Sequence, residues 1–163
     1  MEEQKVLILE SEQVYRNPVI CQQKEQKEII YTEEQRTAIQ TFSRDYEQGL
    51  RKTYLLYGVT GSGKTEVYME MIAKVLSEGR QAIVLIPEIA LTYQTVMRFY
   101  TRFGERVSIL NSRMSQGERY DQMERVKKGF LVIRRPPRST LFTPFEKLGL
   151  IVIDEEHEPT YKS

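Results

Sequence analysis

The chain has 163 residues, with 24 lysines and arginines against 23 aspartates and glutamates. Its length suits one domain with its own core, and its balanced charge gives no general attraction to nucleic acid, so any DNA contact must come from local groups. A single cysteine excludes an internal disulfide and a cysteine-rich zinc cluster. No apolar stretch is long enough to cross a membrane and no secretory signal is visible, so we expect a soluble, cytoplasmic monomer.

The first 30 residues differ in character from the rest of the chain. A charged, glutamine-rich stretch at 22–28 predicts a linker or solvated edge, to which we assign no function. From residue 31 to 163 we expect one ordered domain. Thr32 and Gln35 form a capping box, and apolar residues at helical spacing then predict a helix that ends near Gly49.

Residues 58–65 read GVTGSGKT, which is a complete Walker A motif. The apolar run at 53–57 before it predicts a strand, and helical spacing after it predicts a helix that ends near Gly79. Strand, loop and helix in this order favour ATP binding over a glycine-rich turn of no function. The predicted ATP-binding residues in the loop are Gly58, Val59, Thr60, Gly61, Ser62, Gly63, Lys64 and Thr65.

The chemistry of a triphosphate explains these residue types. Glycines let the backbone turn its N–H groups inward toward the anion. Lys64 is expected to reach the β- and γ-phosphates, and the Thr65 hydroxyl is expected to ligate Mg²⁺.

Strands and helices alternate through the middle of the chain. We expect strands at 81–86, 107–110 and 130–133, and helices at 92–103 and from Ser115 to Gly129, where Ser115 and Glu118 form a second capping box. This alternation predicts an α/β fold with a mostly parallel sheet and helices on both faces.

A second motif, which is acidic, follows the apolar run at 148–153. That run has the character of a strand buried on both faces. Ligands of such sheets bind at the carboxyl ends of the strands, so Asp154 and Glu155 should face the Walker A loop. We expect Asp154 to hold Mg²⁺, and Glu155 to orient and deprotonate the attacking water. Together with Lys64 they are the predicted catalytic residues; the alternative is a charged, solvated strand end.

Several blocks in fixed order resemble the PriA family of primosomal replication-restart helicases. They are TEEQ at 32–35, GVTGSGKTEVY at 58–68, PEIALT at 87–92, LF and PF at 141–145, and LGLIVIDEEH at 148–157. The resemblance covers about residues 31 to 163, and QVYRNP at 13–18 resembles the segment just before that core. It implies the RecA-like first lobe of a superfamily 2 helicase, with ATP and Mg²⁺ as cofactors and 3′-to-5′ DNA unwinding. Forked or single-stranded DNA, other primosome proteins and single-strand-binding proteins are the implied partners.

The resemblance also implies roles for single residues. Gln35 matches the residue that recognises adenine, although the capping box explains it as well. Pro87, Glu88 and Thr92 match a motif that approaches the tracking DNA strand; the alternative is a helix start with Thr92 as a local hydrogen-bonder. His157 matches a residue that links the ATP site to DNA-dependent movement, and a solvent-facing histidine is its alternative.

The string RRPPRSTLF at 134–142 departs from the family pattern. An Arg-Pro-Pro run at 135–137 stands where the family usually has a glycine, and the prolines fix φ and remove two N–H donors. Arg138 and Ser139 still align as phosphate contacts. The string also resembles translated sequencing-adapter DNA, so a partly corrupted reading frame is an alternative.

The chain stops just beyond the acidic motif, where the family continues with a zinc module and a second RecA-like domain. The zinc ligands therefore do not lie in this chain. The second domain also supplies an arginine whose loss costs about 10³- to 10⁵-fold in rate. We expect weak ATP-Mg²⁺ binding, little hydrolysis and no unwinding by this chain alone. The alternatives are a non-catalytic nucleotide-binding remnant and another P-loop ATPase, such as a transporter subunit or a restriction-enzyme motor.

Overall fold

The structure is a computed structural model that describes residues 28–59, 61–87, 89–110, 115–127, 131–134 and 145–154. Its elements are α2 (Glu33–Glu47), α3 (Lys64–Ser77), β1 (Gln81–Leu85), α4 (Tyr93–Phe103), a 3₁₀ helix (Gly104–Arg106), β2 (Val107–Leu110), α5 (Gln116–Lys127), β3 (Leu131–Arg134) and β4 (Leu148–Ile153). All the predicted helices are confirmed, and so are all the predicted strands except the one at 53–57. No helix within these ranges is long and apolar enough to cross a membrane.

The strands form a four-stranded sheet in the order β2-β3-β1-β4, and all neighbouring pairs are parallel. In the centre, Ile83 of β1 is in register with Val132 of β3 and Ile151 of β4. The carboxyl ends of all four strands therefore lie at the same edge of the sheet. The predicted parallel α/β architecture is confirmed.

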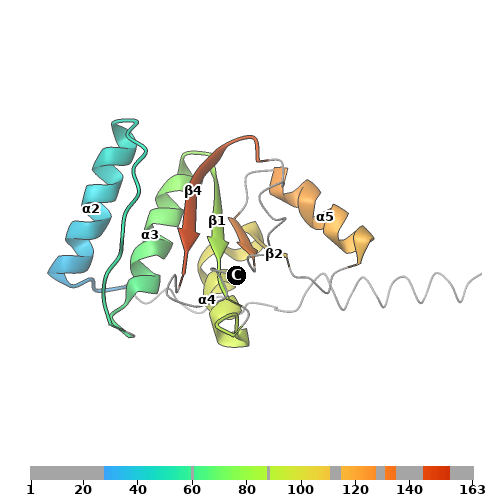
Figure 1. The fold of residues 1–163 in the computed structure, drawn as a ribbon, viewed down its shortest axis with the longest axis horizontal. Coiled ribbons are helices and arrows are strands. Elements are labelled where there is room, and N and C mark those ends of the chain that lie inside the picture. The colour runs from blue at the N-terminus through green and yellow to red at the C-terminus, as the bar shows by residue number, and fades with distance from the viewer. Residues whose placement is uncertain are drawn as a thin grey trace, which may run out of the picture.

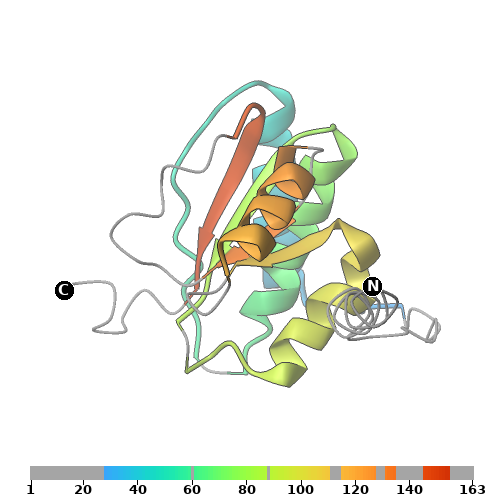
Figure 2. The ribbon, with the colours of Figure 1, turned by 90° about the vertical axis from the view of Figure 1, so that its right-hand side faces the viewer.

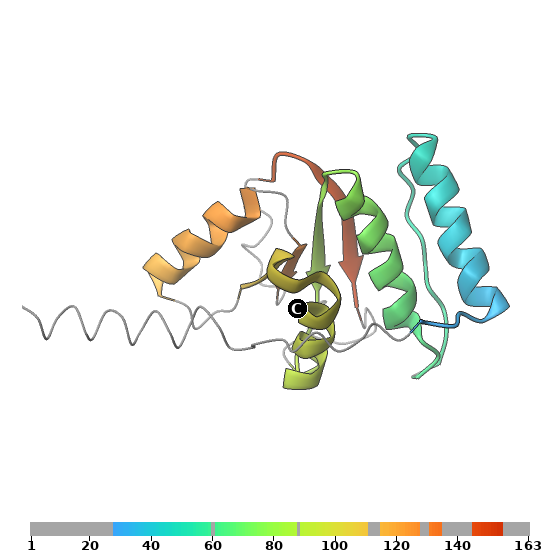
Figure 3. The same ribbon diagram turned by 180° about the vertical axis from the view of Figure 1, so that it is seen from behind.

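Helices cover the sheet on both faces, as the alternation predicts. Figure 2 shows α5 on the near face of the sheet and α3 on the far face. The α5 side is fixed in part by Ser108 of β2, whose hydroxyl donates to the Gln122 side chain. On the other side α2 lies outermost, with α3 between it and the strands (Figure 1, Figure 3).

The core lies between α3 and the sheet. Ile72 and Val75 of α3 are completely buried, and so are Ala82 and Val84 of β1. The aromatic ring of Phe99 brings α4 into the same core. Because α3 starts at Lys64, within the Walker A motif, this packing holds the end of the motif against the sheet.

The two predicted capping boxes are both present. In α2, the Thr32 hydroxyl accepts from the Gln35 backbone N–H while the Gln35 side chain accepts from the Thr32 backbone. In α5, Ser115 and Glu118 make the same reciprocal pair, at 3.3 and 2.8 Å. These local signals set the starts of the helices as the sequence predicts.

The predicted strand at 53–57 is wrong. The segment forms no strand in the structure, although its side chains alternate as they would in one. Leu55 and Tyr57 are 77% and 97% exposed, whereas Tyr54 and Leu56 pack against the core. A strand also requires a backbone partner. Here the segment is held instead by side-chain contacts to α2, beside which it runs in Figure 1.

The expectation that 148–153 is buried on both faces is also wrong. Leu150 and Val152 pack against the core, but Ile151 and Ile153 on the other face are 46% and 49% exposed. Within the described sheet β4 is an edge strand that pairs with β1. A continuous apolar run does not reveal whether a strand lies at the centre or at the edge of its sheet.

Candidate nucleotide site

The Walker A loop leads directly into α3. Gly61 and Gly63 have φ angles of 81° and 80°, a left-handed conformation that favours glycine. Gly63 is the N-cap, and α3 continues for 14 residues from Lys64. The unpaired N–H groups and partial positive charge of such a helix start are suited to an anion. Gly61 and Gly63 therefore turn the chain into the start of α3.

Lys64 points into its own loop. Its amino group donates to the carbonyl oxygen of Gly58 and, at 3.4 Å, to that of Val59. The cation therefore lies within the loop that is predicted to hold the phosphates. Phosphate oxygens are stronger acceptors for an ammonium group than neutral carbonyls are. A bound triphosphate is thus expected to replace these carbonyls as the partner of Lys64.

Gln35 connects α2 to the loop. Its Oε1 accepts from the Thr32 backbone N–H at 2.9 Å, and its Nε2 donates to the carbonyl oxygen of Ser62 at 2.9 Å. A Cβ atom on Gly63 would lie 2.3 Å from that Nε2, so a side chain there would displace the Gln35 amide. The capping-box interpretation of Gln35 is confirmed. Its predicted contact with adenine stays a prediction; beyond these two bonds the amide has a second N–H and a second lone pair.

Tyr68 joins the Walker A helix to a predicted magnesium ligand. Its hydroxyl donates to Asp154 Oδ2 at 2.8 Å, and Thr65 lies three residues before it on the same face of α3. The Asp154 backbone is fixed separately, because its N–H donates to the carbonyl oxygen of Leu85 at 2.9 Å. Asp154 therefore lies beside the first turn of α3, as the sequence predicts. Burial and the neighbouring Asp154 carboxylate raise the pKa of Tyr68 well above its usual range, so the phenol is neutral and can donate.

These oxygen atoms suit magnesium. A hydroxyl and a carboxylate are hard oxygen ligands, and Mg²⁺ in nucleotide sites is commonly held by one or two carboxylates together with the substrate phosphates. Among the described residues, no three His, Cys, Asp or Glu side chains form a group that could hold a metal by themselves. Thr65 and Asp154 thus fit a metal that arrives with its nucleotide.

Tyr68 is a candidate site residue that the sequence does not identify. It lies on the helical apolar stripe of α3, where an aromatic residue normally predicts core packing. The useful signal would have been its spacing: Thr65 and Tyr68 are three residues apart and therefore share one face of the helix.

An ionic network joins α3 to α4. Arg98 pairs with Glu66, and Arg102 pairs with both Glu66 and Glu70. The Tyr31 hydroxyl, just before α2, donates to Glu70 at 2.9 Å. The helix that follows the Walker A loop is thereby tied to the helix that follows the predicted DNA-contact motif.

That predicted DNA-contact motif lies at the carboxyl end of β1. Pro87 accepts backbone hydrogen bonds from Ala90 and Leu91, both at 3.0 Å, and so forms a tight turn. Thr92 is the N-cap of α4 and accepts from the Thr95 backbone N–H at 3.3 Å. The local hydrogen-bonding alternative for Thr92 is therefore observed, while its contact with DNA stays a prediction.

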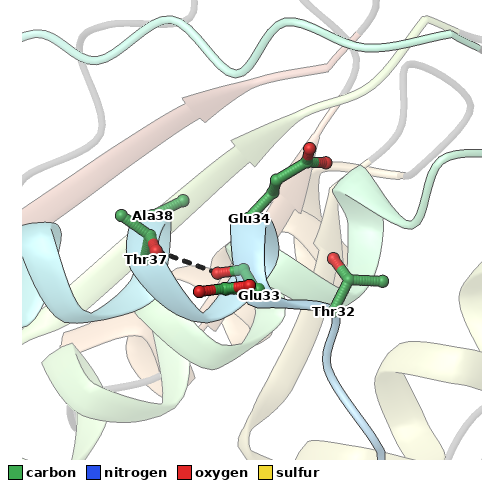
Figure 4. Close-up of a pocket in the computed structure, with 5 residues that line it drawn as sticks. All are labelled: Thr32, Glu33, Glu34, Thr37 and Ala38. Carbon is green, nitrogen blue, oxygen red and sulfur yellow. Dashed lines mark hydrogen bonds between the residues drawn. The ribbon is translucent and has the colours of Figure 1, made fainter.

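An open hollow of about 770 Å³ lies along the start of α2 (Figure 4). Its lining residues are Thr32, Glu33, Glu34, Thr37 and Ala38. The Thr37 hydroxyl donates to the backbone carbonyl of Glu33 at 2.9 Å, so it is satisfied within the helix. Two carboxylates line the hollow and no residue of the Walker A loop does, which makes it unsuitable for a triphosphate.

Several predicted site residues lie outside the described part of the chain, and the structure does not test them. They are Thr60 in the loop, Glu88, Arg138 and Ser139 among the DNA contacts, and Glu155 and His157 in the acidic motif. The first 27 residues also lie outside it.

Comparison with known proteins assigns the family. A model of the DEAD/DEAH box helicase family matches residues 32–162. The chain is 46% identical over 161 residues to replication restart protein PriA of Bacillus subtilis, covering 98% of this chain and 20% of that protein. It is 47% identical over 109 residues to PriA of Haemophilus influenzae, and 43% identical over 129 residues to PriA of Chlamydia pneumoniae.

Those two matches cover 67% and 79% of this chain, and 15% and 17% of the relatives. The chain thus spans about a fifth or less of the length of these curated relatives. Its described fold is the parallel α/β arrangement that the RecA-like prediction requires. The chain belongs to the DEAD/DEAH box helicase family, in which it is similar to replication restart protein PriA.

Proposed function

We propose that this chain is the nucleotide-binding lobe of an ATP-driven DNA helicase of replication restart. The observation that carries the proposal is the 2.8 Å hydrogen bond from the Tyr68 hydroxyl to Asp154. It joins the Walker A helix to the acidic strand end, which are the two halves of a nucleotide-magnesium site. Membership of the helicase family and similarity to PriA support the same function.

In this proposal the loop binds ATP through the backbone N–H groups of residues 58–65, and Gln35 contacts adenine. Lys64 leaves the carbonyl of Gly58 and donates to the β- and γ-phosphate oxygens. Thr65 and Asp154 hold Mg²⁺, which when bound neutralises charge on the phosphates. Glu155 orients and deprotonates the water that attacks the γ-phosphate.

The proposed DNA contacts are Pro87, Glu88, Thr92, Arg138 and Ser139, and His157 is proposed to couple them to the ATP site. Their support is the position of Pro87 and Thr92 at the carboxyl end of β1. The Asp154 N–H donates to Leu85, the last residue of that strand, so the two motifs are neighbours. We also propose that the full protein moves from 3′ to 5′ on DNA and has a zinc module elsewhere. Its proposed partners are primosome and single-strand-binding proteins, and its proposed location is the cytoplasm.

Coupling between nucleotide and DNA tests this function. The affinity of the chain for fluorescently labelled forked DNA is measured by anisotropy without nucleotide, with ADP-Mg²⁺ and with a non-hydrolysable ATP analogue and Mg²⁺. We expect the affinities to differ by about 5- to 150-fold, the usual range for coupled sites. Lys64→Ala is the control and should bind DNA with one affinity in all three conditions. Equal affinities for the unmodified chain would contradict the proposal and favour a non-catalytic remnant.

A further inference from the structure

Tyr68 is an unusually constrained tyrosine. Its side chain is 3% exposed, and its ring stacks on Phe99 of α4 with centroids 6.4 Å apart and planes at 20°. Phe99 is itself completely buried. The ring is therefore fixed between α3 and α4, and its hydroxyl has little freedom to change position.

The hydroxyl of Tyr68 determines how the Asp154 carboxylate is turned. A tyrosine hydroxyl has one proton, and here that proton is donated to Asp154 Oδ2 at 2.8 Å. Tyr68 and Thr65 are three residues apart and share one face of α3, so the carboxylate is held toward the side of the helix that carries Thr65.

Asp154 has particular need of such orientation. It directly follows β4, the edge strand of the described sheet, whose outward side chains Ile151 and Ile153 are about half exposed. Its backbone N–H is fixed to Leu85, but a backbone bond does not set the rotation of the carboxylate. The hydrogen bond from Tyr68 restrains that rotation from a rigid neighbour.

We propose that Tyr68 is a positioning residue for magnesium, holding the Asp154 carboxylate in the orientation in which it binds, together with Thr65, the metal of ATP-Mg²⁺. This inference rests on the proposed nucleotide function. Partners that orient metal ligands typically contribute about 10- to 100-fold to metal affinity. Tyr68 does not itself contact the nucleotide in this account, so its hydroxyl should matter only when magnesium is present.

The chain offers a matched control. The Tyr54 hydroxyl donates to Asp45 Oδ2 at 2.8 Å, the same kind of bond at the same distance, but between α2 and the segment that follows it. Tyr68→Phe and Tyr54→Phe each remove one phenolic hydroxyl that bonds to an aspartate. Only Tyr68→Phe removes it beside the predicted magnesium ligands.

The experiment titrates Mg²⁺ into the full chain with a fluorescent ATP analogue present, and repeats the nucleotide titration in EDTA. We expect Tyr68→Phe to raise the magnesium concentration at half-saturation by about 10- to 100-fold. Nucleotide affinity in EDTA should match that of the unmodified chain. Tyr54→Phe should leave both values unchanged and lower only the melting temperature.

The outcomes separate the inference from the function on which it rests. If the unmodified chain binds nucleotide with a magnesium requirement and Tyr68→Phe has the same requirement, the positioning role is wrong and the nucleotide function stands. If the unmodified chain shows no magnesium-dependent binding, both are wrong.

Phe99→Leu gives a second measurement should Tyr68→Phe not fold. It keeps the Tyr68 hydroxyl but loosens the ring, so it should raise the half-saturation concentration in the same direction. An unchanged value for a folded Phe99→Leu chain would overturn the positioning role.

Discussion

Two tyrosine-aspartate hydrogen bonds of 2.8 Å serve different purposes in this molecule. Tyr54 and Asp45 are nine residues apart, and Lys52 also donates to Asp45, at 3.1 Å. That pair closes the turn after α2. Tyr68 and Asp154 are 86 residues apart and join the Walker A helix to the end of β4. The same chemical bond fixes a local turn in one region and assembles a candidate site in the other.

The surroundings explain the difference. Asp45 is buried and has a cation beside it, so its charge is already neutralised by Lys52. Asp154 is bonded to Tyr68 of α3, near the start of the helix, where nucleotide and magnesium are proposed to bind. The first region should therefore control stability alone. The second should control nucleotide binding with smaller effects on folding.

The largest expected effect is on stability and belongs to the α2 region. Phe42 is 3% exposed and packs against Tyr46 and Tyr54, with ring centroids 5.4 and 5.7 Å away. Phe42→Ala should lower the free energy of unfolding by about 3–5 kcal/mol, because it removes a large core side chain. Urea unfolding measures this loss. Nucleotide affinity of the folded fraction should not change, and a parallel fall in affinity would show that the two regions are not separable.

Two glycine substitutions separate backbone strain from damage to the loop. Gly63 and Gly79 have φ angles of 80° and 73°, so alanine at either position should cost about 1–2 kcal/mol in unfolding experiments. Only at Gly63 would the new Cβ meet the Gln35 amide; at Gly79 nothing lies within 4 Å.

We therefore expect Gly63→Ala, and not Gly79→Ala, to weaken nucleotide binding, by about fivefold for one lost hydrogen bond. A titration with a fluorescent ATP analogue makes the comparison. Equal affinities in the two variants would mean that the bond from Gln35 to Ser62 does not support the loop.

Acid should lower the free energy of unfolding through Asp45 in the α2 region. The hydrogen bond from Tyr54, followed by that from Lys52, lowers the pKa of Asp45 below its ordinary value of 3.8. Because the native pKa is the lower one, the ionised carboxylate stabilises the fold above pH 3.8, and this contribution is lost as the pH falls through the native pKa. Urea unfolding across this range should show a steeper loss for the unmodified chain than for Asp45→Asn. Parallel curves would contradict the assignment.

The smallest effect is expected for the ion pair between α3 and α4. The Arg98 side chain is 50% exposed and that of Glu66 is 27% exposed. Such partly exposed pairs contribute about 0.2–1 kcal/mol. Arg98→Ala should therefore lower stability slightly at low salt and less at high salt, because salt screens the pair. A large loss that is insensitive to salt would indicate that Arg98 acts through packing instead.

Local signals predicted most of the fold. The capping boxes at Thr32 and Ser115 mark helix starts because both partners lie within one turn of each other. The segment at 53–57 was misassigned because strand formation depends on a distant backbone partner, which side-chain alternation does not reveal. The edge position of β4 escaped prediction for the same reason, since a strand's neighbours are set by the whole sheet.

The candidate site was also predicted only in part, and the residues within continuous motifs were the ones identified. Lys64, Thr65 and Asp154 could be identified because the motif and the strand end are continuous in sequence. Tyr68 could not be identified, because the partner of its hydroxyl is 86 residues away. Its apolar ring, at helical spacing, predicts only a residue of the hydrophobic core. The predicted roles of Glu155 and His157 stay predictions.

The central claim is that the loop around Lys64 is a nucleotide site, and calorimetric titration of ATP-Mg²⁺ into the chain tests it most directly. We predict measurable binding that Lys64→Ala weakens by about tenfold or more, since a charge-assisted hydrogen bond contributes about 1.5–3 kcal/mol. The melting temperature without nucleotide should be unchanged, because within the described part of the chain the Lys64 amino group hydrogen-bonds only to its own loop. Equal binding by the two chains, or none by the unmodified chain, would contradict the account.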